Sequence, residues 1–127
     1  MKKILIILSF WISVYANANS NWRFVGINED SVIYFIDRNS MQKSGDSVTF
    51  WNRENLKQRD EFGNFSYKNQ VTINCRTRER ISRYIMSYDD LDNNGKLTES
   101  FIVPNAKWKP IPPDSLNWEM MKIVCGK

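Results

Sequence analysis

The chain has 127 residues, with 18 lysines and arginines against 14 aspartates and glutamates and a formal net charge of +4. This small basic excess argues against a dedicated nucleic-acid binder, which usually carries a strongly basic face. The sequence has no histidine, which removes the commonest general base and the usual imidazole metal ligand. Its five glycines form no phosphate-binding loop, so we expect no enzyme, no cofactor and no metal site.

The first 18 residues have the pattern of a secretory signal peptide. Lys2 and Lys3 precede an apolar run at 4–15, and the small-x-small sequence Ala16-Asn17-Ala18 follows. The apolar run is too short to span a bilayer, which needs about 20 residues. We therefore predict a cleaved signal at 1–18, a single domain at 19–127 and no integral membrane segment after cleavage. No cysteine follows the predicted cleavage point, so we expect no lipoprotein anchor and a location in the periplasm or at the cell surface.

Six later segments show the short, alternating pattern of half-buried strands. The clearest is 65–75, where Phe65, Tyr67, Val71, Ile73 and Cys75 share one face and polar residues share the other, which turns Cys75 toward the core. The predicted strands are Trp22–Ile27, Ser31–Asp37, Asp46–Asn52, Phe65–Cys75, Arg80–Tyr88 and Lys96–Val103.

The pattern changes near the C-terminus. Prolines at 110, 112 and 113 prevent regular ladder pairing, and Asp114-Ser115 offers a helix N-cap. From Leu116 to Cys125, apolar residues recur at helical spacing. The sequence therefore predicts an α+β fold: a single antiparallel β-sheet of about six strands with a C-terminal α-helix packed on one face.

The chain has two cysteines, Cys75 and Cys125. An even number of cysteines in a small exported domain most simply forms one disulfide, which here would join the helix to a central strand. The alternative is a redox-active pair, which requires a short Cys-x-x-Cys spacing that the sequence lacks. Closing a loop of this length would stabilise the fold by roughly 4 kcal/mol in the loop-closure model.

The stretch 89–100, DDLDNNGKLTES, resembles part of a calcium loop. Asp90, Asp92, Asn94 and Gly95 stand at the spacing of the first ligands and the turning glycine of such a loop. Its twelfth position, however, is Phe101, where a bidentate carboxylate is required, and the flanking segments read as strands rather than helices. Asn-Gly between two strands is a strong hairpin signal, so we interpret the stretch as an acidic hairpin tip.

Four arginines gather around the predicted turn between the fourth and fifth strands: Arg76, Arg78, Arg80 and Arg83. Clustered guanidinium groups can bind carboxylate-rich or sulfated partners through paired hydrogen bonds. The other reading is a solvated hairpin end whose charges protect a sheet edge. We also expect the tryptophans at 22, 51, 108 and 118 to lie in the core.

A series of landmarks runs along the whole of the predicted domain. They are Trp22, IYFID at 33–37, GDSVTFW at 45–51, Cys75, YDDLDNNGK at 88–96, WKPIPPDS at 108–115 and the final MMKIVC at 120–125. The chain resembles the bacterial surface-adhesin protein E family, and the WKPIPPDS run and the last cysteine are the most specific parts of this likeness.

The resemblance implies a small antiparallel sheet with a C-terminal helix, a disulfide between Cys75 and Cys125, and an exported protein whose partner is a host extracellular-matrix or serum protein. The alternative reading is a periplasmic structural or envelope-maintenance protein of the same fold, because fold does not fix function. An open sheet edge would also allow a homodimer.

Overall fold

The computed structural model describes residues 19–126. The predicted signal peptide lies outside these residues. The elements in chain order are β1 (Trp22–Ile27), β2 (Ile33–Asp37), the 3₁₀ turn η1 (Arg38–Ser40), β3 (Gln42–Ser44), β4 (Ser47–Asn55), β5 (Ser66–Asn74), β6 (Glu79–Tyr88), the 3₁₀ turn η2 (Leu91–Asn93), β7 (Leu97–Ile102), β8 (Lys109–Pro110) and α2 (Leu116–Cys125).

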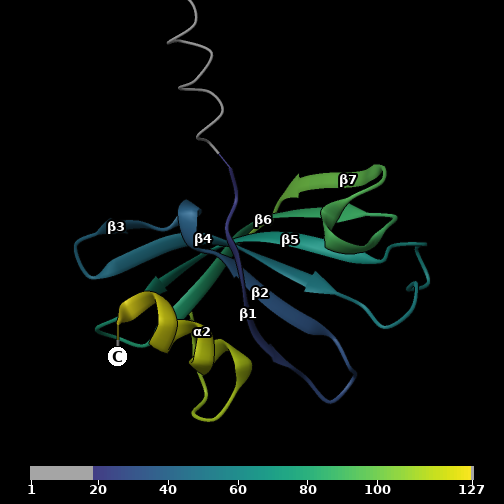
Figure 1. The fold of residues 1–127 in the computed structure, drawn as a ribbon. Coiled ribbons are helices and arrows are strands. Elements are labelled where there is room, and N and C mark those ends of the chain that lie inside the picture. The colour runs from purple at the N-terminus through teal and green to yellow at the C-terminus, as the bar shows by residue number, and fades with distance from the viewer. Residues whose placement is uncertain (1–18, 127) are drawn as a thin grey trace, which may run out of the picture.

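The strands form one antiparallel sheet, as predicted, with the order β1-β2-β4-β5-β6-β7 (Figure 1). Two short strands were not predicted. β3 pairs with the first part of β4, and β8 pairs with the first part of β6. β3 lies beside β4 in line with β2, and β8 lies beside β6 in line with β7. In each case a short non-strand segment separates the two strands. Pro110 can stand in β8 because the pairing there is only two residues long.

The predicted helix is α2, and its two ends are capped as the sequence indicates. The Ser115 hydroxyl accepts a hydrogen bond from the backbone N–H of Trp118 at 3.1 Å, which satisfies one of the free donors at the helix start. Gly126 ends the helix in the left-handed conformation, with φ of 73°. None of the helices in residues 19–126 is long and apolar enough to cross a membrane.

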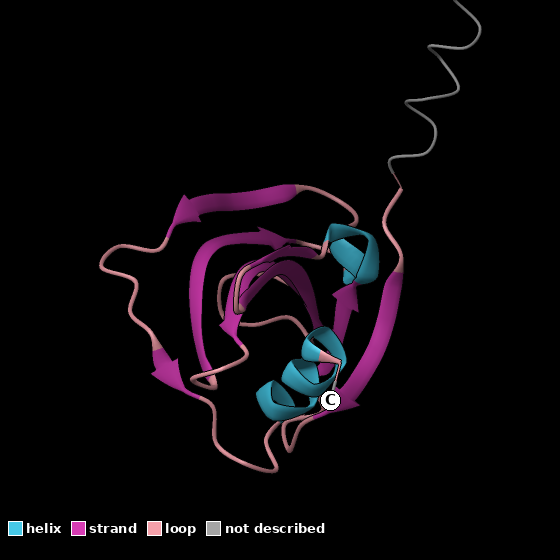
Figure 2. Ribbon diagram, turned by 90° about the vertical axis from the view of Figure 1, so that its left-hand side faces the viewer, coloured by secondary structure: helices cyan, strands magenta, loops and turns pink. Residues whose placement is uncertain are grey.

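The core lies between α2 and one face of the sheet, which we call the inner face. On β4 this face carries residues 48, 50, 52 and 54, and the register places residues 73, 71, 69 and 67 of β5 beside them. Figure 2 shows how the strands curl around one side of α2. The buried apolar side chains of the core are Ile36, Val48, Phe50, Val71, Ile73, Ile111, Met120, Met121 and Val124.

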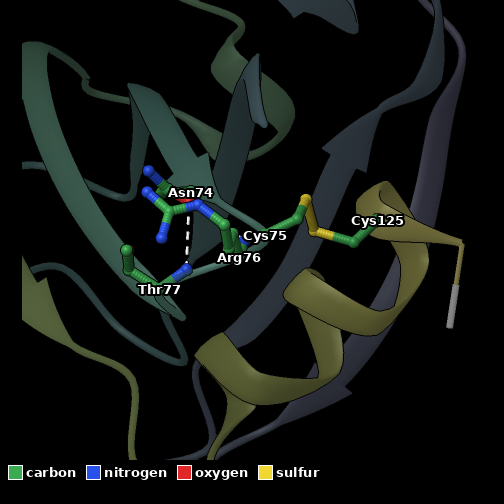
Figure 3. The surroundings of a disulfide bond; sticks show 5 residues. All are labelled: Asn74, Cys75, Arg76, Thr77 and Cys125. Carbon is green, nitrogen blue, oxygen red and sulfur yellow. Dashed lines mark hydrogen bonds between the residues drawn. A yellow bond between two sulfur atoms is a disulfide. The ribbon is translucent and has the colours of Figure 1, made fainter. Parts of the chain in front are cut away.

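A disulfide between Cys75 and Cys125 joins the end of β5 to the end of α2, with the two Cα atoms 5.8 Å apart (Figure 3). Both cysteines are partly buried and pack against the core. The bridge was predicted both from the cysteine count and from the expected position of the helix. It ties the only α-helix of the described residues to the sheet, across a sequence separation of 50.

The expectation that the tryptophans lie in the core is wrong. Trp108 is 40% exposed, and Trp22, Trp51 and Trp118 are only half-buried. Trp22 and Trp51 stand on the outer face of the sheet beside positively charged side chains, where they do not meet the apolar core. Trp118 comes nearest to the prediction, because it packs against the core from α2.

Candidate functional site

The predicted arginine cluster begins in the turn between β5 and β6. The side chain of Asn74 accepts hydrogen bonds from the backbone N–H groups of Arg76 and Thr77, both at 3.0 Å, and so shapes the turn (Figure 3). Arg78 has a φ of 60°, a conformation that few residues other than glycine adopt. The turn therefore holds two arginine side chains out into solvent.

The four arginines do not form one cluster. Arg76 is exposed and makes an ion pair with Asp46, at 3.0 Å between Nε and Oδ2. The guanidinium of Arg78 lies 5.4 Å from the ring centroid of Trp118 on α2. Arg80 is half-buried on the inner face of the sheet, and Arg83 is exposed in a bulge of β6. Only Arg76 and Arg78 thus share the turn, and their role in binding stays a prediction.

The acidic stretch joins β6 to β7, as the hairpin interpretation predicts, although its tip is a 3₁₀ turn rather than a two-residue Asn-Gly turn. Asp92 and Asn93 both have φ of 58°, and Gly95 has φ of 72°. A side chain at Gly95 would collide with Asp89. Within residues 19–126, no group of three or more histidine, cysteine, aspartate or glutamate side chains is placed to hold a metal ion.

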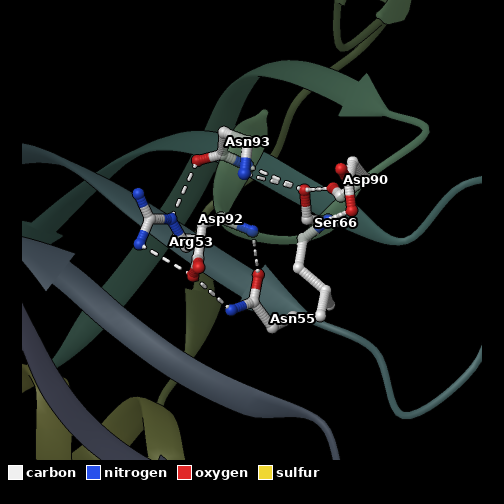
Figure 4. Close-up of polar contacts among 7 residues, drawn as sticks. Arg53, Asn55, Ser66, Asp90, Asp92 and Asn93 are labelled. Atoms are coloured by element: carbon white, nitrogen blue, oxygen red, sulfur yellow. Dashed lines mark hydrogen bonds and ion pairs between the residues drawn. The ribbon is translucent and has the colours of Figure 1, made fainter. Parts of the chain in front are cut away.

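The carboxylates of this tip bind protein groups. Asp92 Oδ1 accepts hydrogen bonds from Asn55 Nδ2 at 2.8 Å and from Arg53 Nη1 at 3.3 Å (Figure 4). Asn93 Oδ1 accepts from Arg53 Nε at 3.2 Å, and Ser66 Oγ accepts from the backbone of Asn93 at 3.0 Å. The tip is therefore fastened to the outer face of β4 and β5.

Arg53 connects the acidic tip to an aromatic layer. Its guanidinium lies 4.1 Å from the ring centroid of Trp22 and 5.5 Å from that of Phe35. Burial lowers the pKa of Arg53, and the neighbouring carboxylates of Asp92 and Asp37 act in the opposite direction. Sequence reasoning missed this residue, since its partners are 18 to 40 positions away in the sequence and no local pattern marks them.

β7 is the longest strand of the sheet whose residues are all exposed, with six of them. Ile102 is 74% exposed, Leu97 44% and Phe101 39%. β7 pairs with β6 along one edge, and no other strand of the described residues pairs with it. Figure 1 places β7 on the side of the view away from α2. The sequence predicted this strand but not that it forms an open edge of the sheet.

Cross-strand hydrogen bonds hold β7 against β6. The hydroxyl groups of Tyr84 and Ser100 lie 2.5 Å apart, and those of Ser87 and Thr98 lie 2.8 Å apart. The backbone N–H of Val103 also donates to the carbonyl of Arg83 at 2.9 Å. An open edge that is held in this way presents a row of free backbone groups, which is a template for another strand.

Comparison with known proteins agrees with this fold. Residues 22–126 match the family described as Surface-adhesin protein E. The chain belongs to the surface-adhesin protein E family. No match was found among curated proteins.

Solved structures of protein E from Haemophilus influenzae have the same fold. One crystal form superposes with a TM-score of 0.65 at 16% identity, covering 86% of this chain and 93% of that one. The selenomethionine form gives a TM-score of 0.64 at 15% identity, covering 86% and 90%. Protein E from a non-typeable strain gives 0.56 at 16% identity, covering 86% and 80%.

Proposed function

We propose that this chain is an exported binding module that attaches to a host extracellular-matrix or serum protein through the open edge of β7. Membership in a family of surface adhesins supports the binding role. One observation carries the choice of surface: all six residues of β7 are exposed on a strand that is paired on one side only within the described chain.

In this proposal the partner adds an extended segment to the sheet. Main-chain hydrogen bonds to the free edge of β7 supply affinity, and side chains that alternate along the strand supply specificity. Ile102 and Leu97 stand on the outer face of the sheet, because the register places them beside Tyr84 and Tyr88. These exposed apolar groups would contact side chains of the added segment.

The arginine turn would take part at one end of the same edge. β8 continues the line of β7 along β6, and the backbone N–H of Ile111 just after it donates to the carbonyl of Arg78 at 3.0 Å. Arg76 and Arg78 would then attract an acidic partner. Arg80 and Arg83 belong to the cluster predicted from the sequence, but Arg80 is half-buried and Arg83 lies in the bulge of β6, away from the turn. Charge reversal is therefore best restricted to Arg76 and Arg78.

The test measures binding of the purified protein to a panel of immobilised extracellular-matrix and serum proteins. The parent should bind at least one of them saturably. Ile102→Lys should weaken that binding by about tenfold, because a lysine on an edge strand opposes the pairing of another strand. Since Ile102 is 74% exposed, its replacement should leave the free energy of unfolding unchanged.

Ile27→Lys is the matched control. Ile27 is a 55% exposed isoleucine on β1, at the opposite end of the strand order. The Ile27→Lys variant should bind the host protein like the parent. Failure of the parent to bind any protein of the panel would overturn the proposal, and equal loss in both lysine variants would move the site away from β7.

A further inference from the structure

The inner face of the sheet holds a pocket of about 570 Å³ beyond the part that α2 covers. The floor comes from residues of β4, β5 and β6 that share this face, including Glu54, Asn69 and Arg80, and Phe62 and Phe101 form part of the wall. The volume lies in the range of sites for small ligands, about 300 to 1,000 Å³. β7 contributes Glu99 and Phe101 to this pocket through its inner face, not through its open backbone edge.

Glu54 and Arg80 carry opposite charges and both line this pocket. None of the ion pairs found within residues 19–126 joins these two side chains. Glu54 accepts a hydrogen bond from Asn69 Nδ2 at 2.6 Å, and its burial raises the pKa of its carboxyl. The guanidinium of Arg80 makes no side-chain hydrogen bond to any described residue, and its Nε is buried without an acceptor. Burial lowers the pKa of Arg80, and the nearby carboxylate of Glu54 acts in the opposite direction.

A third polar group at the same place also lacks a partner. Asn52 is 1% exposed, and its Oδ1 is buried with no hydrogen-bond donor in the described chain. Asn52, Glu54 and Arg80 line a smaller recess that adjoins the main pocket. A buried polar group without a partner is unfavourable, and more so when it is charged. The site therefore holds one buried acceptor without a donor, Asn52 Oδ1, and one buried donor without an acceptor, Arg80 Nε.

Several other polar groups of the wall are already paired. Tyr67 donates to the carboxylate of Asp60, which also accepts from the backbone N–H groups of Phe62 and Asn64, both at 2.9 Å. Asn64 Oδ1 accepts from Thr98 Oγ1 at 2.6 Å. This network fixes the backbone on either side of the loop at 60–64. It also holds the backbone of Phe62, whose ring is 75% exposed.

We propose that this pocket binds a small zwitterion with an apolar side chain, of the amino-acid or short-peptide class. The ligand carboxylate lies against the Arg80 guanidinium, and the ligand ammonium lies against the Glu54 carboxylate. The exposed carboxylate of Glu99 at the pocket wall favours the ammonium end, and the apolar side chain contacts Phe62 and Phe101. An anion or a cation alone pairs with one of the two half-buried charges and is repelled by the other.

The experiment measures the binding of phenylalanine and of leucyl-phenylalanine to the purified full protein, by calorimetry and by NMR chemical-shift changes. At least one of the two should bind saturably. N-acetylation of that ligand removes its ammonium charge, and amidation removes its carboxylate. Each change should weaken binding by at least about tenfold, because it leaves a half-buried protein charge without its partner on the ligand.

The protein variants test the same pairing from the other side. Glu54→Gln and Arg80→Gln should each lose at least about tenfold in affinity for the zwitterion. Arg83→Gln is the matched control, because Arg83 is an exposed arginine on the same strand and does not line the pocket. It should bind like the parent.

Absence of binding by both zwitterions would overturn the proposal. If the blocked ligands, or acetate, bound as tightly as the zwitterion, the proposal would be overturned as well, because these ligands do not carry both charges. The ligand series uses the parent protein, so it decides the matter even where Arg80→Gln does not fold. A parent that binds zwitterions but no host protein would contradict the proposed adhesin role and leave the pocket proposal standing.

Discussion

The inner face of the sheet has two halves that differ in chemistry, although the same strands build both. Under α2, β4 and β5 present Val48, Phe50, Val71 and Ile73, all buried and apolar. Farther along the same face they present Asn52, Glu54, Asn69 and Tyr67. The change from apolar to polar residues leads into the pocket half of the face, although Asn52 at the boundary is itself 1% exposed. A periodic pattern thus shows which residues share a face, and the chemistry of those residues changes where the face approaches the pocket.

The largest difference between the two halves should appear when one phenylalanine is removed from each. Phe50 is 1% exposed under α2, so Phe50→Ala should lower the free energy of unfolding by about 3 to 5 kcal/mol. Phe101 is 39% exposed on the open half, and Phe101→Ala should cost less than about 1 kcal/mol. Urea denaturation of both variants checks this. Equal losses would mean that the pocket half is part of the core.

The disulfide holds the covered half closed, and Cys125→Ser should lower the free energy of unfolding by about 2 to 5 kcal/mol under oxidising conditions. The comparison is made by denaturant titration of the parent and the variant with and without a reductant. The difference between them should largely vanish when the parent is reduced. A parent whose denaturation midpoint is the same in both conditions would show that the bridge does not stabilise the fold.

A smaller effect is expected where β1 meets the start of α2. A Cβ atom at Gly26 would lie 2.6 Å from Cδ2 of Leu116, so the helix packs directly onto the strand backbone. Gly26→Ala should cost about 1 to 2 kcal/mol through this overlap. In a Leu116→Ala background the same change should cost less, because the overlapping atom is gone. Strictly additive costs in the double variant would argue against a close contact between β1 and α2.

The smallest expected effect concerns the charge in the open half. Burial raises the pKa of Glu54 in the folded protein above the ordinary value of 4.5, which applies to the unfolded chain. At a pH between the unfolded and the folded pKa, the folded protein therefore binds more protons than the unfolded chain. The free energy of unfolding should therefore fall as pH rises through this interval, relative to that of Glu54→Gln. Glu99→Gln, at an exposed position, is the control. Parallel pH profiles for the parent and Glu54→Gln would show that Glu54 is not desolvated.

Much of the fold could be predicted because its signals are local. The alternation at 65–75, the N-cap at Ser115 and the spacing of apolar residues from Leu116 each depend on neighbours in sequence. Features that depend on distant partners could not be predicted in this way. Arg80 lines the pocket and Arg83 is exposed in a bulge of β6, but the sequence alone does not show which face of this strand opens into a pocket or where the bulge lies.

The acidic tip shows the same limit at the candidate site. Its turn residues could be predicted from the sequence. Its hydrogen bonds to Arg53 and Asn55 could not, because they depend on how the hairpin packs on a strand that lies almost 40 positions earlier. The open edge of β7 likewise depends on the order of strands in the sheet, which alternation does not encode.

The most direct test of the proposed adhesin role is where the domain is displayed. Cells that produce the protein with a C-terminal tag are treated with protease while intact and again after the outer membrane is opened. We predict digestion on intact cells, since a module that binds host proteins must reach them. Protection until the membrane is opened would contradict it and would favour a periplasmic structural protein of the same fold.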